Sequence, residues 1–143
     1  MANRIPIEAL QKAVYSRLST ALATLTPAVS LYAYYPPQDA TYPLAVLSQF
    51  VFTAVPDKRG ANPQNAVATI EVYSDSPSAA QINQTVNKIV NSLSTVLTME
   101  SSFADVGLGA QESIDTFATY DADQDKRILT AVVKYSWTVD DRI

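Results

Sequence analysis

The chain has 143 residues, of which 48% are hydrophobic and 17% are charged, so it can form a packed core and is not predicted to be disordered. It contains no cysteine and no histidine, which excludes disulfides, thiolate catalysis and Cys-based metal sites and removes the commonest general base. The ten basic residues are scattered, and the net charge of −4 comes mainly from an acidic surplus in residues 100–143, which argues against direct binding of nucleic acid. The length predicts one domain over residues 1–143. No apolar run reaches membrane-spanning length and the N-terminus lacks a signal-peptide pattern, so the expected location is the cytoplasm of the cell that makes the protein.

A helix is predicted from Pro6 to about Leu25. Pro6 suits a first helical position, where its missing N–H has no intrahelical partner. Thr26-Pro27 ends the segment. Apolar side chains recur at steps of three and four residues and form one stripe, which consists of Ile7, Leu10, Val14, Leu18, Leu22 and Leu25.

Three strands are predicted next, at Val29–Tyr35, Leu44–Ala54 and Val67–Ser74. A proline corner joins the first two, because Pro36, Pro37 and Pro43 each fix the local backbone. The apolar run Leu44-Ala-Val-Leu indicates burial on both faces of the sheet.

The second and third strands are joined by Val55–Ala66, a polar, turn-forming segment that is long for a hairpin loop. Such a loop is expected to be functional or mobile. Its Lys58 and Arg59 are interpreted first as solubilising charges, and alternatively as a grip on a phosphate or on a carboxylate of a partner.

A second helix is predicted to run to Leu97, with Ser76 as its N-cap and Pro77 as its first residue. One strand within Val106–Tyr120 and another at Arg127–Val139 follow. The expected class is therefore α+β, in the order α-β-β-β-α-β-β. Two helices would cover a mixed, mostly antiparallel sheet of about five strands.

The turn between the last two strands contains Asp121, Asp123 and Asp125, at the spacing of a calcium loop. Lys126 and Val132 stand where that loop needs a glycine and a carboxylate, so a solvated hairpin turn is the preferred interpretation.

Two other acidic residues, Glu112 and Asp115, lie three apart on a predicted strand. Strand alternation places them on opposite faces, which argues against an acid–base pair.

Tyrosines gather at the proline corner: Tyr32, Tyr34, Tyr35 and Tyr42. Packing against the core is the first interpretation of this cluster. A contact between subunits is the alternative, because tyrosine is favoured where proteins meet.

Several short motifs are distributed along nearly the whole chain. They are Leu10-Gln11 on the first helix, Pro36-Pro37 at the corner, Tyr42-Pro43-Leu-Ala-Val-Leu leading into the second strand, Ala68-Thr-Ile-Glu-Val-Tyr-Ser74, a helix on Ala79–Leu97, and Val133-Lys-Tyr-Ser-Trp-Thr138 on the last strand. In this order of elements and motifs, the chain resembles the tail terminator (tail completion, or tail-to-head joining) proteins of long-tailed bacteriophages.

The resemblance implies a structural virion protein with no enzymatic activity and no cofactor. It implies a homo-oligomeric ring, typically of six subunits, that sits on the tail tube protein, stops tube polymerisation and offers a surface to the head–tail connector or neck protein. The expected location is the head-proximal end of the virion tail, after assembly in the host cytoplasm. DNA would pass through without being read, and no membrane is involved.

The residues expected to contact other subunits or the tube are Lys58, Arg59, Tyr34, Tyr35 and Tyr42. The residues expected to face the channel are Asp121, Asp123 and Asp125, together with Asp140 and Asp141. Acidic side chains there would repel the DNA strand and let it slide.

Two alternatives remain at this stage. One is a neck or head-closure protein of the same particles. The other is a small ligand-binding α+β domain, which predicts a pocket with convergent polar groups.

Overall fold

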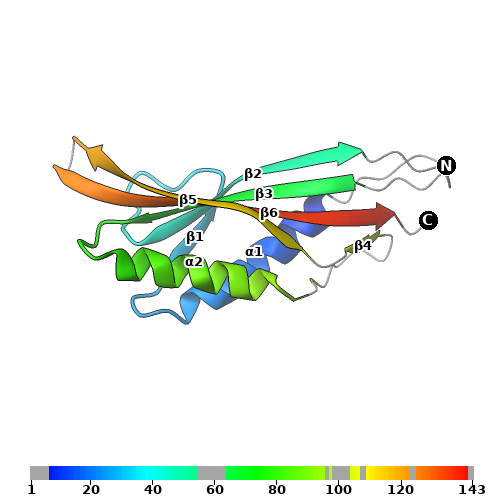
Figure 1. Cartoon of the computed structure of the whole chain (residues 1–143), viewed down its shortest axis with the longest axis horizontal. Helices are drawn as coiled ribbons and strands as arrows, with labels where there is room; N and C mark the ends of the chain where they lie inside the picture. The colour runs from blue at the N-terminus through cyan, green and yellow to red at the C-terminus, as the bar shows by residue number, and fades with distance from the viewer. Residues whose placement is uncertain are drawn as a thin grey trace.

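The computed structural model describes residues 7–54, 64–95, 97, 104–106, 109–122 and 125–141. Pro6, Asp123 and most of the long loop, with Lys58 and Arg59, lie outside these ranges. Two helices and six strands are described in the order α1 Ile7–Ala23, β1 Ser30–Ala33, β2 Leu44–Ala54, β3 Gln64–Ser74, α2 Ala79–Leu93, β4 Ala104–Val106, β5 Ala110–Asp121 and β6 Lys126–Asp141 (Figure 1).

All strands belong to one sheet, in which β1, β2, β3 and β6 lie side by side in that order. The far edge of β6 pairs with β5 along residues 126–136 and with β4 along residues 139–141. β5 corresponds to the strand predicted within Val106–Tyr120, whereas β4 overlaps that range only at Val106. Among the described strand pairs, only β1 and β2 are parallel, so the predicted α+β class and its mixed, mostly antiparallel sheet are confirmed.

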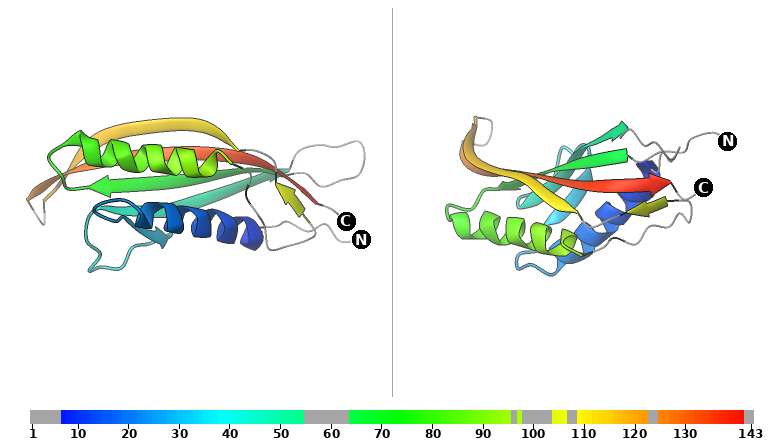
Figure 2. Two further views of the ribbon diagram at one scale, coloured as in Figure 1. Left: turned by 90° about the horizontal axis from the view of Figure 1, so that it is seen from below. Right: turned by 45° about the vertical axis from the view of Figure 1, so that its right-hand side comes forward.

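Both helices lie on one face of this sheet (Figure 2). Four members of the predicted apolar stripe of α1 are fully buried, namely Leu10, Val14, Leu18 and Leu22, and Leu25 packs partly buried against the core beyond the end of the helix. Neither α1 nor α2 has the length and apolar character of a transmembrane helix. Together, the two helices cover this face of the sheet and close the hydrophobic core.

The sheet side of the core comes mainly from β3 and β6, where alternate residues face the helices. Ile70 lies opposite Val133 in the antiparallel register, and both are fully buried. Trp137, opposite Ala66, is the largest fully buried side chain. The alternation predicted for these two strands therefore sets the inner face of the sheet.

Bulges interrupt the regular pairing of two other strands, β2 and β5. On β2 the register shifts between Leu47 and Gln49, and on β5 it shifts between Gln111 and Ser113. Glu112 sits at the second bulge and accepts a hydrogen bond of 2.6 Å from Ser136 Oγ on the face away from the helices. Asp115 is paired with Val132, whose side chain points to that same face. The expectation that Glu112 and Asp115 face opposite sides is therefore wrong, because a bulge adds one residue to the strand without a partner.

The second helix begins two residues later than predicted. Its N-cap is Ser78, which has extended backbone angles and whose Oγ accepts a hydrogen bond of 3.2 Å from the N–H of Ala80. Ser76, the predicted cap, instead accepts from the N–H of Ser78 at 3.3 Å. The last helical residue is Leu93, although Leu97 is still buried beyond it.

This arrangement predicts unequal costs for two conservative substitutions. Ser78→Ala removes the side-chain acceptor at the N-cap and is expected to lower the free energy of unfolding by about 1 kcal/mol. Ser76→Ala, the matched control two residues earlier, is expected to cost less. Urea unfolding measures both, and a larger loss in Ser76→Ala would contradict the assigned helix start.

Candidate functional site

The proline corner between β1 and β2 folds against the outer face of the sheet, which is the face away from the helices. It forms a pocket of about 470 Å³ whose lining residues are Tyr34, Tyr35, Pro36, Tyr42, Leu44, Val46, Ser48, Glu71 and Tyr73. A second pocket of about 360 Å³ adjoins it, because Tyr42 and Tyr73 line both. Its other lining residues come from the β5–β6 hairpin and include Tyr120 and Asp121. The two pockets together are called the tyrosine groove.

The corner holds Tyr34 in an unusual backbone conformation, with φ at 67°. A bulky residue in this left-handed region is rare and persists only where neighbouring contacts fix it. Here the N–H of Tyr34 donates to the carbonyl of Leu47 at 3.0 Å, and its hydroxyl accepts from Gln11 Nε2 at 2.6 Å. The next side chain, Tyr35, is left 87% exposed. Residues of β1, β2 and α1 thus hold the corner so that Tyr35 projects into solvent.

The corner also explains why the start of β2 is buried on both faces. Ala45 and Leu47 face the core beneath the helices, whereas Leu44 and Val46 line the pocket beneath the corner. All four are buried, as the apolar run predicted.

Glu71 and Tyr73 form the polar part of the groove. The hydroxyl of Tyr73 donates to Glu71 Oε2 at 2.5 Å. Burial, and then the hydrogen bond to Glu71 and its negative charge, raise the pKa of Tyr73 well above its usual value. Glu71 is half-buried, and no cationic side chain pairs with it in the described part of the chain. The groove therefore contains a carboxylate whose charge is uncompensated there.

The opposite side of the molecule has a different chemistry. A surface groove of about 630 Å³ runs between the two helices and is called the helix groove, lined by Lys12, Ala13, Ser16, Arg17, Thr20, Ala21, Thr24, Lys88, Asn91 and Ser92. In the described ranges, this lining contains three cations and no acidic side chain.

Two of those cations already have partners. Arg17 Nη1 donates to the carbonyl of Ser92 at 3.0 Å and to Thr95 Oγ1 at 2.6 Å, which satisfies a free carbonyl near the end of α2. Lys12 pairs with Glu8 at 3.2 Å on the helix surface. Lys88 is half-buried and has no polar partner among the residues that the structure describes.

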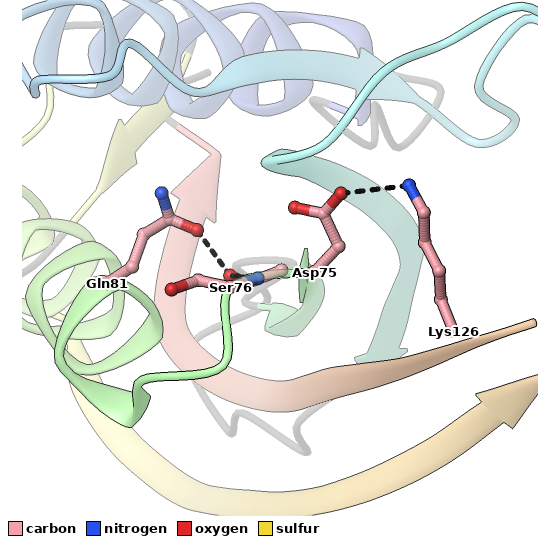
Figure 3. A network of polar contacts seen from close by, with 5 residues as sticks. Asp75, Ser76, Gln81 and Lys126 are labelled. Carbon is pink, nitrogen blue, oxygen red and sulfur yellow. Dashed lines mark hydrogen bonds and ion pairs between the residues drawn. The ribbon is translucent and has the colours of Figure 1, made fainter.

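The β5–β6 hairpin carries the acidic turn. Asp121 ends β5, and Asp125 has a left-handed φ of 52° next to the start of β6. Lys126 Nζ lies 3.2 Å from Asp75 Oδ2, which ties the hairpin to the connection between β3 and α2 (Figure 3). Next to this pair, Ser74 Oγ at the end of β3 donates to Gln81 Oε1 in the first turns of α2. Because the Lys126–Asp75 pair is substantially exposed, it positions the turn more than it stabilises the fold.

The acidic residues of the chain end do not gather at one place. Asp121 and Asp125 lie at one end of β6, and Asp140 and Asp141 lie at its other end (Figure 1). The extended strand between them spans on the order of 45 Å. They therefore form two separate groups within one subunit. In the described ranges, no group of three or more acidic side chains is arranged to hold a metal ion.

The structure thus brings together Tyr34, Tyr35 and Tyr42, which the sequence had marked as contact candidates. Sequence reasoning missed Glu71 and Tyr73 as parts of the same groove. Their separation by two residues on a strand predicted one shared face, but only the pairing of β2 with β3 places that face beneath the corner. The cations of the helix groove were also missed.

The fold is similar to that of a chain in a solved structure of the virion of a native gene transfer agent (GTA) particle. The TM-score is 0.65 at 18% sequence identity, and the match covers 92% of this chain and 96% of that one. No curated protein matches the sequence significantly. Residues 12–140 match the model of a phage family described as tail completion protein gp17. Because that match covers most of the chain, the protein belongs to this family of structural virion proteins.

The raised pKa of Tyr73 predicts a specific loss of stability in alkali. An unfolded tyrosine ionises near pH 10. The folded protein keeps Tyr73 protonated above that pH, so its contribution is present below about pH 10 and is lost as the pH rises further, by at most about 1.4 kcal/mol per pH unit. Tyr73→Phe is therefore expected to flatten the decline in the free energy of unfolding above pH 10, as measured by urea unfolding. An undiminished decline in this variant would contradict the assignment.

Proposed function

We propose that this protein closes the head-proximal end of a phage-type tail tube as a ring, typically of six copies. In this role it ends polymerisation of the tube protein and presents a surface to the head connector. The observation that carries the proposal is membership of the tail completion family over residues 12–140. The protein would assemble in the host cytoplasm and remain in the virion, with DNA passing through the ring unread.

The shape of the subunit supports this role. A closed ring needs heterologous contacts, in which one surface of a subunit meets a different surface of its neighbour. The described chain offers two such surfaces on opposite sides of its sheet, the tyrosine groove and the helix groove. Its helices and sheet share one continuous core, which suits a rigid building block.

Tyr34, Tyr35 and Tyr42 are the proposed contacts with a neighbouring subunit or with the tube. Tyr34 and Tyr35 are exposed and Tyr42 is half-buried. Tyrosines are characteristic of such contacts because they bring a large area at low entropic cost. Asp121, Asp123 and Asp125 of the hairpin turn are proposed to face the channel, where negative charge would keep DNA from adhering. Since Asp121 also lines the hairpin end of the tyrosine groove, that end of the groove would border the channel. Asp140 and Asp141, at the other end of β6, would lie at a different place along the subunit.

Electron microscopy of particles made without this protein tests the proposed role. Overlong tail tubes are expected, because nothing would end polymerisation. Adding the purified protein during tube growth in vitro is expected to restore a limited length. Tubes of normal length that lack heads would contradict the proposal and favour a neck or head-closure protein.

Lys58 and Arg59 are proposed to meet acidic groups of a partner during assembly. The double substitution Lys58→Glu with Arg59→Glu is expected to leave the thermal unfolding midpoint unchanged and to reduce binding to tube ends, as measured by sedimentation with purified tubes. Undiminished binding by this variant would remove the loop from the mechanism.

A further inference from the structure

We propose that the tyrosine groove of one copy binds the helix groove of the next copy, with Glu71 pairing with Lys88 across the contact. The inference rests on the proposed function, because it names the surfaces that join the ring. It goes further by assigning the chemistry of each side: a carboxylate among tyrosines on one subunit, and a lysine between two helices on the other.

The tyrosine groove is built to accept a cation. Glu71 is half-buried, and in the described part of the chain its one polar partner is the Tyr73 hydroxyl. A carboxylate offers about four acceptor sites, so most remain available. Tyrosine faces add attraction for an ammonium group through their quadrupoles. Among the residues that the structure describes, neither pocket of the groove has a basic side chain in its lining.

The helix groove supplies the cation. Among the described residues, its lining holds Lys12, Arg17 and Lys88 and no acidic side chain, which favours a positive potential there. Arg17 is committed to the end of α2, and Lys12 to Glu8. Lys88 has no polar partner in the described ranges and carries a flexible four-carbon stem, so it is the cation best able to reach outward.

The two grooves are complementary in shape as well as in charge. Tyr35 projects from the corner with 87% of its side chain exposed. The walls of the helix groove include the small side chains Ala13, Ser16 and Ala21, which leave space for an aromatic ring. A tyrosine inserted into a neighbour's groove is a typical anchor of a protein interface.

The two grooves cannot meet within one molecule, because one is lined by the helices and the other by the outer face of the sheet. Figure 2 shows that both helices lie on one face of the sheet. Because the two grooves are complementary in charge and shape, the proposed partner of each groove is a second copy of this chain. Each copy would use one groove toward each neighbour, which is the heterologous arrangement that closes into a ring.

The absence of cysteine from the chain permits a direct test by cross-linking. Ser48→Cys places a thiol in the tyrosine groove, and Asn91→Cys places one in the helix groove, without changing either paired charge. Wild-type ring formation is first established by light scattering, alone and with purified tubes. The two variants are then mixed under the assembling condition and treated with a short thiol-reactive linker. Cross-linked dimers are expected in the mixture and not in either variant alone.

Two controls share the same elements. Asn65→Cys lies on β3 with Glu71, and Asn83→Cys lies on α2 with Lys88, but neither residue lines a groove. Cross-linking of the controls with the same yield as the test pair would overturn the inference. Dimers of Ser48→Cys with itself would also overturn it, because they indicate a symmetric contact. Assembled wild-type rings without any cross-link between the test pair would do so as well, while leaving the proposed function intact.

Charge reversal tests the pair itself. Glu71→Lys and Lys88→Glu are each expected to weaken self-association about tenfold or more, and the double variant is expected to recover most of the loss. Thermal unfolding checks the fold, and Glu71→Gln with Lys88→Gln provides milder variants of the same positions. Unchanged association in all single variants would overturn the pairing. A wild-type protein that neither forms rings nor caps tubes would instead overturn the proposed function.

Discussion

The pairing of β6 with three other strands is the constraint on which the rest of the molecule depends. This strand of 16 residues pairs with β3 on one edge and with β4 and β5 on the other. Its buried side chains on the inner face, such as Val133 and Trp137, form the centre of the core beneath both helices. A slip of one residue would turn these side chains to the outer face, so core burial fixes the register of the whole sheet. That register also determines where the hairpin turn and Glu71 lie.

A sheet with helices on one face leaves the other face to be covered in another way. Here the proline corner covers only the part over β2 and β3, and the result is a groove rather than a second core. The helix layer on the other side has a groove of the opposite charge. Both surfaces therefore result from the placement of both helices on one face of the sheet. A subunit of this design carries unlike surfaces on its two sides, which suits repeated head-to-tail assembly.

Patterns within one element were predictable from the sequence. The stripe of α1 and the alternation on β3 and β6 each reflect a local period of burial, and both are present in the structure. The predicted start of α2 was wrong because three serines in a row of alternate positions can act as caps. Ser74, Ser76 and Ser78 each accept a hydrogen bond from the backbone N–H two residues later. The bulge at Glu112 was missed because most residues of β5 are exposed, so its sequence has no clear alternation of buried and exposed residues in which an inserted residue could be recognised.

The candidate site was only partly predictable, because the sequence shows which residues are close along the chain but not which strands pair. Tyr34, Tyr35 and Tyr42 are close in sequence, so their clustering was visible, whereas Glu71 joins them only through strand pairing.

The proposed ring depends on subunits that dock through opposite sides of one sheet. A cryo-electron microscopy reconstruction of the head-proximal tail end would show this contact. We expect a closed ring in which the outer sheet face of each copy lies against the helix layer of the next. A ring whose contacts leave both of these faces open to solvent would contradict it.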